Sequence, residues 1–160
     1  MASLSAIRAA IKTKLGAVAG IGKVHDFERF SKAEKDFQDL YKDISDNRIR
    51  GWNFYRESTI ERDLDNGSVR RVHAWRINGF LSLDDADTSG KSFDDLVETI
   101  ATAFRTDRTL GGLVDDIKDL SQEDGPSGIQ VDAIEPVMFA GVLCHRARLR
   151  ITTETTENSV

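Results

Sequence analysis

The sequence predicts an α+β fold built on an antiparallel or mixed β-sheet. Two observations carry this prediction: three segments repeat apolar residues at helical intervals, and a long β-hairpin is followed by further strand candidates. The expected order is helix, strand, helix, hairpin, helix and then at least two strands. Because strands and helices do not alternate regularly, we expect an antiparallel or mixed sheet with the helices packed mainly on one face.

The three helical segments each begin near a residue that can cap a helix. Ser3 or Ser5 can cap the first. The second spans about residues 32–46 and opens with the spacing of a capping box. We expect Ser92 to cap the third. The apolar faces consist of Leu4, Ile7, Ile11, Leu15 and Val18, then Ala33, Phe37, Leu40, Tyr41 and Ile44, and finally Phe93, Leu96, Val97, Ile100, Ala101 and Phe104.

A β-hairpin is predicted over residues 49–64 and 69–83. The Asn66-Gly67 pair between them favours a two-residue type I′ turn, in which opposite residues have numbers that sum to 133. This register places Tyr55 on a polar face with Asn78 and directs Phe54 and Trp75 toward the core, while a slip by one residue would exchange the two faces.

The other strand candidates are short segments near both ends of the chain. We expect strands at residues 23–30, at 129–139 with a break at Pro136, and at 142–152. In the last of these, apolar residues alternate with a basic set that contains Arg146, Arg148 and Arg150. Residues 1–152 should form a single domain, and residues 153–160 a polar, flexible tail.

Charge and hydropathy restrict the partners of the chain. The net charge of -5 argues against a surface that binds duplex DNA. Residues 84–98 contain six acids against one lysine, and we expect an electronegative surface there. No apolar stretch approaches the length of a membrane span. The N-terminal bases are spread along a helix rather than preceding an apolar block, so we expect no signal peptide and synthesis in the cytoplasm.

No pattern in the sequence predicts catalysis or metal binding. His25, His73 and His145 fall on three different predicted strands and lack the spacing of metal ligands. Cys144 and His145 are strand neighbours, whose side chains point to opposite faces, so we expect Cys144 to be a core residue. Residues 89–92 imitate the end of a phosphate-binding loop, but they are better explained as a helix start. We therefore expect no enzyme and no cofactor.

The candidate functional residues instead suit contacts between proteins. The arginine row could hold nucleic acid, but salt bridges across strands or between subunits suit it at least as well. Aromatic, turn and acidic residues complete the expected assembly surface, which consists of Trp52, Tyr55, Asn66, Gly67, Asp84, Asp85, Asp87, Asp115, Asp116, Arg146, Arg148 and Arg150.

The linear arrangement of several segments also resembles a known family. These are the opening helix 7–11 leading into 18–25, the strand 72–79, the helix 93–104 with 108–112, and the closing segment 143–149. Over about Ser5 to Glu154 the chain resembles the small tail terminator (tail completion, minor tail) proteins of tailed bacteriophages.

The resemblance implies an α+β virion protein at the head-proximal end of the tail, assembled in the host cytoplasm. Six copies would form a ring on the last ring of tail tube protein, stop tube polymerisation and present a surface to the head connector or neck protein. DNA would pass through the ring without specific binding. Two alternatives stay open: a head-tail joining or neck protein, and a small α+β ligand-binding domain or enzyme.

Overall fold

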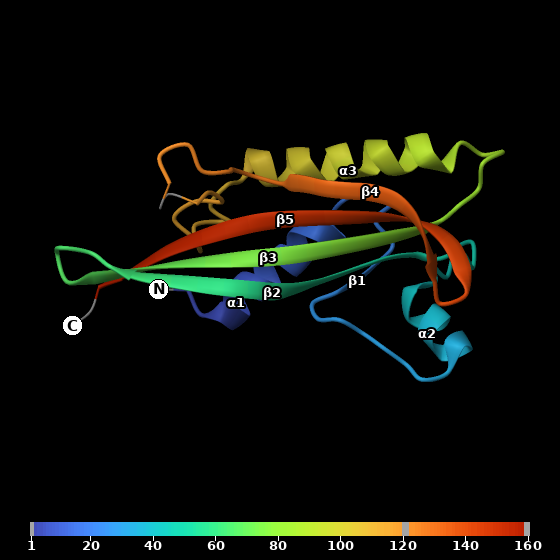
Figure 1. Ribbon diagram of the computed structural model, residues 1–160, viewed down its shortest axis with the longest axis horizontal. Coiled ribbons are helices and arrows are strands. Elements are labelled where there is room, and N and C mark those ends of the chain that lie inside the picture. The colour runs from blue at the N-terminus through green and yellow to red at the C-terminus, as the bar shows by residue number, and fades with distance from the viewer. Residues whose placement is uncertain (1, 120–121, 159–160) are drawn as a thin grey trace.

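A computed structural model of the chain describes residues 2–119 and 122–158. Within these residues, five strands form a mixed sheet in the order β1-β2-β3-β5-β4 (Figure 1). The strands are β1 (Lys23–His25), β2 (Arg50–Asp63), β3 (Ser68–Ser82), β4 (Gln130–Phe139) and β5 (Val142–Asn158). β1 runs parallel to β2, and the other neighbours are antiparallel. The predicted α+β class is confirmed, and the sheet is mixed.

Helices α1 (Leu4–Gly16) and α3 (Ser89–Thr106) cover one face of the sheet. Their apolar stripes and the facing strand residues form the main core, which includes Ile11, Phe104, Phe54, Trp75 and Leu149. The side-chain oxygen of Ser3 caps α1 by accepting a hydrogen bond from the Ala6 N–H at 3.1 Å. None of the helices in the described residues is long and apolar enough to cross a membrane.

Helix α2 (Glu34–Tyr41) covers one end of the opposite face, which we call the polar face. There Tyr41, Ile49, Phe80 and Cys144 form a second, smaller core, and Phe139 stacks on Phe80 with ring centroids 3.8 Å apart. Of the helices in the described part of the chain, only α2 lies over the polar face (Figure 1). The prediction that the helices lie mainly on one face is confirmed.

Two helix boundaries differ from the sequence prediction. α2 ends at Tyr41 instead of near residue 46, because the carboxylates of Asp43 and Asp46 accept the backbone N–H groups of Ser45 and Arg48 and stabilise turns. α3 begins at Ser89, so Ser92 lies inside its first turn and does not cap it.

The hairpin turn has three loop residues, so the predicted two-residue turn and its register are wrong. Only Gly67 adopts a positive φ, of 78°, as in a type I turn followed by a left-handed glycine. Pairs near the turn, such as Asp63 with Val69, have numbers that sum to 132. A bulge at Glu57 of β2 then shifts the register by one more residue. Phe54 therefore lies on the same face as Trp75 of β3, and both are buried in the core.

The final strands are longer and more regular than predicted. β4 continues through Pro136 without a break, because β4 is an edge strand and its outer side needs no backbone N–H for the sheet. β5 extends to Asn158, which pairs with Ser68, so the expected flexible tail is wrong for residues 153–158. Residues 159–160 lie outside the described residues. The predicted strand at 23–30 is limited to Lys23–His25.

Candidate assembly surfaces

The four hairpin candidates have different positions in the structure. Trp52 is fully buried, and its indole ring packs against Phe93 with a centroid distance of 5.9 Å, so its assignment to an assembly surface is wrong. Tyr55 is half-buried on the polar face opposite Arg76. Asn66 and Gly67 are exposed at the tip of the hairpin, which extends beyond α3 in Figure 1.

The aspartate candidates form two groups that the structure does not bring together. Asp85 and Asp87 are exposed in the loop before α3, and Asp84 is half-buried beside them. Asp115 and Asp116 follow the far end of α3, and a helix of 18 residues is roughly 27 Å long. Asp116 accepts two hydrogen bonds from Arg108, at 2.8 and 2.7 Å, whereas Asp115 is exposed.

The arginine row lies on the polar face of β5. Arg146 pairs with Glu135 of β4, and Arg150 lies 3.7 Å from the carboxylate of Asp132. Among the described residues, Arg148 has no ion-pair partner. Two of the three arginines therefore form cross-strand salt bridges within the chain, which reduces the positive charge available to nucleic acid.

Arg76 of β3 is the centre of this charged region. It is 7% exposed, and its guanidinium lies 2.5 Å from an oxygen of Asp132 and 3.3 Å from one of Glu57. The two carboxylates come from bulged positions on opposite sides of β3: Glu57 lies on the adjacent strand β2, and Asp132 lies on β4, beyond β5. Both carboxylates therefore contact the same buried side chain, that of Arg76.

We expect Arg76→Met to lower the free energy of unfolding by about 1 to 3 kcal/mol, because it removes the buried base that Glu57 and Asp132 share and leaves Asp132 with Arg150 alone. Arg148→Met is the matched control and should change the free energy by at most about 0.5 kcal/mol. Urea unfolding followed by circular dichroism measures both values. Equal effects of the two substitutions would contradict this account.

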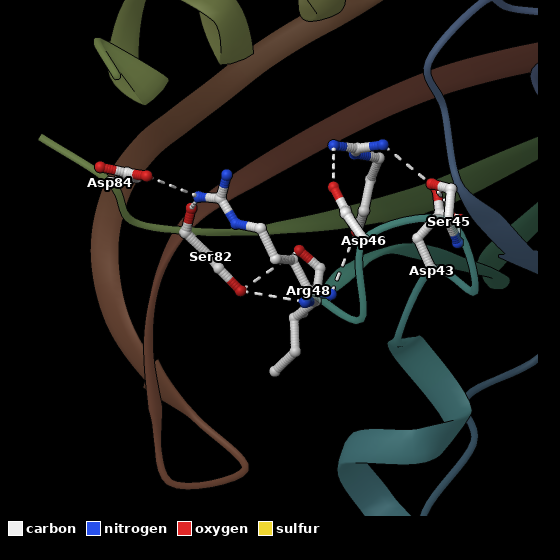
Figure 2. Close-up of polar contacts among 8 residues, drawn as sticks. Asp43, Ser45, Asp46, Arg48, Ser82 and Asp84 are labelled. Atoms are coloured by element: carbon white, nitrogen blue, oxygen red, sulfur yellow. Dashed lines mark hydrogen bonds and ion pairs between the residues drawn. The ribbon is translucent and has the colours of Figure 1, made fainter. Parts of the chain in front are cut away.

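A second polar cluster fixes the loop between α2 and β2, and Figure 2 shows its contacts. Arg50 lies 3.1 Å from Asp43 and 2.8 Å from Asp46, while Arg48 donates to the Ser82 carbonyl at 3.2 Å. These contacts hold the loop that carries Ile44, whose side chain is 93% exposed. The helical spacing predicts Ile44 on the buried face of a longer helix, and this prediction is wrong.

The histidines and the cysteine occupy separate places. His25 contacts the Leu40 carbonyl at 2.7 Å, His73 contacts the Thr59 hydroxyl, and Nε2 of His145 lies 2.8 Å from the Ser89 hydroxyl. Burial raises the pKa of Cys144 to about 11, so its thiol stays protonated at neutral pH. Within residues 2–119 and 122–158, no three metal-binding side chains cluster closely enough to hold an ion.

His73 gives the fold a pH dependence. Burial, with the nearby charges of Arg71 and Arg56, lowers its pKa from 6.5 to about 4. In the folded chain His73 therefore stays neutral down to about pH 4, whereas in the unfolded chain it binds a proton below about pH 6.5. The stabilisation by neutral His73 is complete above that pH and decreases toward pH 4, by roughly 3 kcal/mol in total.

We therefore expect His73→Phe to remove this part of the acid sensitivity. Urea unfolding at pH 7, 5.5 and 4 measures it as the difference in unfolding free energy between the two proteins. The wild type should lose more stability than the variant over this range. Parallel losses in both proteins would show that His73 does not titrate as described.

An open groove of about 630 Å³ lies between α1 and α3. Its walls are mainly apolar, and Lys14 of α1 forms a 3.1 Å ion pair with Asp107 at the end of α3. We call it the α1–α3 groove, and its lining includes Ala10, Thr13, Ala17, Thr99, Ala103 and Leu110. Sequence patterns do not predict this groove, because it forms only where two helices that are distant in the chain pack together.

Exposed apolar side chains form a second unpredicted surface on β4 and the start of β5. They lie on the sheet face that carries α3, at the edge of the sheet, and Met138 is 68% exposed. We call this surface the β4–β5 strip, and it consists of Val131, Ile134, Met138 and Leu143. The sequence contained a signal for this surface. β4 carries apolar residues on both of its faces, although other parts of the chain cover only one of these faces.

These features define a small α+β domain with a mixed sheet, a charged polar face and two separate apolar surfaces outside its core. Comparison with known proteins gives no further assignment, since no protein-family model matches the chain and a search of curated proteins finds no match.

Proposed function

We propose that this chain is a tail terminator protein of a tailed bacteriophage. It would form a ring on the end of the tail tube, stop tube polymerisation and offer a surface to the head connector. The proposal starts from the resemblance of residues 5–154 to that family. The confirmed α+β fold is compatible with it.

The observation that carries the proposal is the apolar surface outside the core. Met138 and Leu143 are 68% and 47% exposed, and both lie on strands rather than on loops. A monomer gains nothing from holding large apolar side chains in water on rigid elements. Such side chains are typical of proteins whose working state is an assembly, and this supports a structural role.

The distribution of charge supports passage of DNA without binding. The chain has a net charge of -5, and Asp85, Asp87 and Asp115 are exposed. Carboxylates of the same chain neutralise part of the arginine row. Phosphate binding needs an excess of free cations on one surface. A ring that exposes acidic side chains at its opening would repel the DNA backbone.

The test is deletion of the coding sequence in the phage that carries it, followed by electron microscopy of the lysate. We expect tails of irregular, extended length that lack heads, and normal virions when the wild-type chain is supplied from a plasmid. Tails of normal length without heads would identify a head-tail joining or neck protein instead. Normal virions without the chain would refute both roles.

A second experiment tests capping directly. Isolated tail tubes are incubated with the purified chain and then with an excess of tail tube protein. We expect bound chain at one tube end and elongation blocked at that end. Elongation at an unchanged rate from both ends would refute the proposal.

A further inference from the structure

We infer that copies of this chain join head to tail, with the β4–β5 strip of one copy seated in the α1–α3 groove of the next. This contact would build the ring proposed above, and only in that respect does it rest on the proposed function. Three properties of the two surfaces support it: their chemistry, their position around α3 and their charge.

Both surfaces are apolar, and one is a depression whereas the other projects from the sheet. The groove is an open apolar depression of about 630 Å³, and the strip presents side chains that project from a sheet edge. The Lys14–Asp107 ion pair links the two helices that form the groove walls. Met138 and Leu143 are the most exposed members of the strip, so they are the side chains available to enter the groove.

The position of the surfaces makes the contact heterologous. Thr99, Ala103 and Thr106 lie on the flank of α3 that faces α1 and line the groove. Ala101 and Arg105 lie on the opposite flank, beside the segment that leads into β4. Because α3 separates the two surfaces, each copy can use its strip on one neighbour and its groove on another, which produces a ring or a filament.

The margins of the two surfaces carry opposite charges. α1, one wall of the groove, contains Arg8, Lys12 and Lys14 and no acid. The strip is bordered by the loop of residues 84–88, which contains three aspartates and no base. The Leu83 N–H donates to the Leu143 carbonyl at 3.0 Å, which holds this acidic segment beside the strip. Seating the strip in the groove brings the acidic margin toward basic α1.

Two double variants, each altering one surface, test the contact. Thr13→Glu with Thr99→Glu places carboxylates in the groove at exposed helical positions. Met138→Glu with Leu143→Glu does the same to the strip. Sedimentation velocity should give a wild-type assembly larger than a dimer, and self-association of each variant should be at least about tenfold weaker, since apolar burial is replaced by buried charge.

Mixing the two variants is the decisive step. The groove variant keeps an intact strip and the strip variant keeps an intact groove, so an equal mixture should form a heterodimer and nothing larger. A mixture that stays monomeric, with both variants folded by circular dichroism, overturns the inference. So does a wild type that remains monomeric up to about 1 mM or stops at a dimer.

Phe30→Glu with Ile44→Glu is the matched control, because both side chains are strongly exposed but lie outside the two surfaces. It should assemble like the wild type, and loss of its assembly would place the contact elsewhere. The tail experiments remain separate. Assembly through this contact without capping would refute only the tail role, and capping by the strip variant would refute only the contact.

Discussion

Gly79→Ala is expected to lower the free energy of unfolding by roughly 3 kcal/mol or more, the upper range for overpacking a core. A Cβ at Gly79 would overlap the benzene ring of Trp52. That indole is fully buried and packs against Phe93, so it has no space into which to move. The loss is a large part of the roughly 5 to 15 kcal/mol that stabilises a typical domain. Urea unfolding monitored by circular dichroism measures it.

Gly16→Ala is the matched control, since Gly16 ends α1 and has no atom within 4 Å of an added Cβ. This substitution should be neutral or stabilising by up to about 1 kcal/mol, because alanine favours the helix. The double variant Gly79→Ala with Trp52→Leu should be more stable than the sum of its parts, because the smaller side chain makes room. Additive losses would show that the ring does not cause the effect.

Trp75→Ala is expected to cost about 3 to 5 kcal/mol and to leave little folded protein at 37 °C. Trp75 is fully buried and lies edge-on to Phe54, with ring centroids 6.1 Å apart. Its indole N–H donates to the Thr153 hydroxyl at 2.9 Å, deep inside the chain. The substitution therefore removes packing between β2 and β3 and also a buried hydrogen bond to β5.

Trp75→Phe separates these two contributions, because it keeps most of the ring packing and removes the N–H donor. We expect a loss of about 1 to 2 kcal/mol from this variant. Circular dichroism is the appropriate signal, since Trp52 would also contribute to fluorescence. If Trp75→Phe were as damaging as Trp75→Ala, the hydrogen bond rather than the packing would dominate.

Periodicity in the sequence was sufficient for the main core. The spacing of Ile7, Ile11 and Leu15 predicts the buried face of α1, and that of Phe93, Val97 and Phe104 predicts the face of α3. Helical and strand periods are local properties, so the sequence of one segment is enough to predict them without knowledge of the rest of the fold. For the same reason the hairpin was found, although its register was not.

The register depended on interactions that no local pattern encodes. The bulge at Glu57 is stabilised by Arg76, which is itself held by Asp132 of β4, more than fifty residues away. The burial of Trp52 depends on the missing side chain of Gly79 across the strand pair. Both are pairings between distant segments, and sequence spacing does not report them.

By itself, the sequence determined the α+β class, the three amphipathic segments, the hairpin and the strand that carries the arginine row. Only the tertiary structure decided which side chains remain at the surface. It buried Trp52, paired Arg146 and Arg150, and left Met138 and Leu143 exposed. The physical reason is that exposure depends on what other segments cover, and the α1–α3 groove and the β4–β5 strip exist only once distant elements have packed.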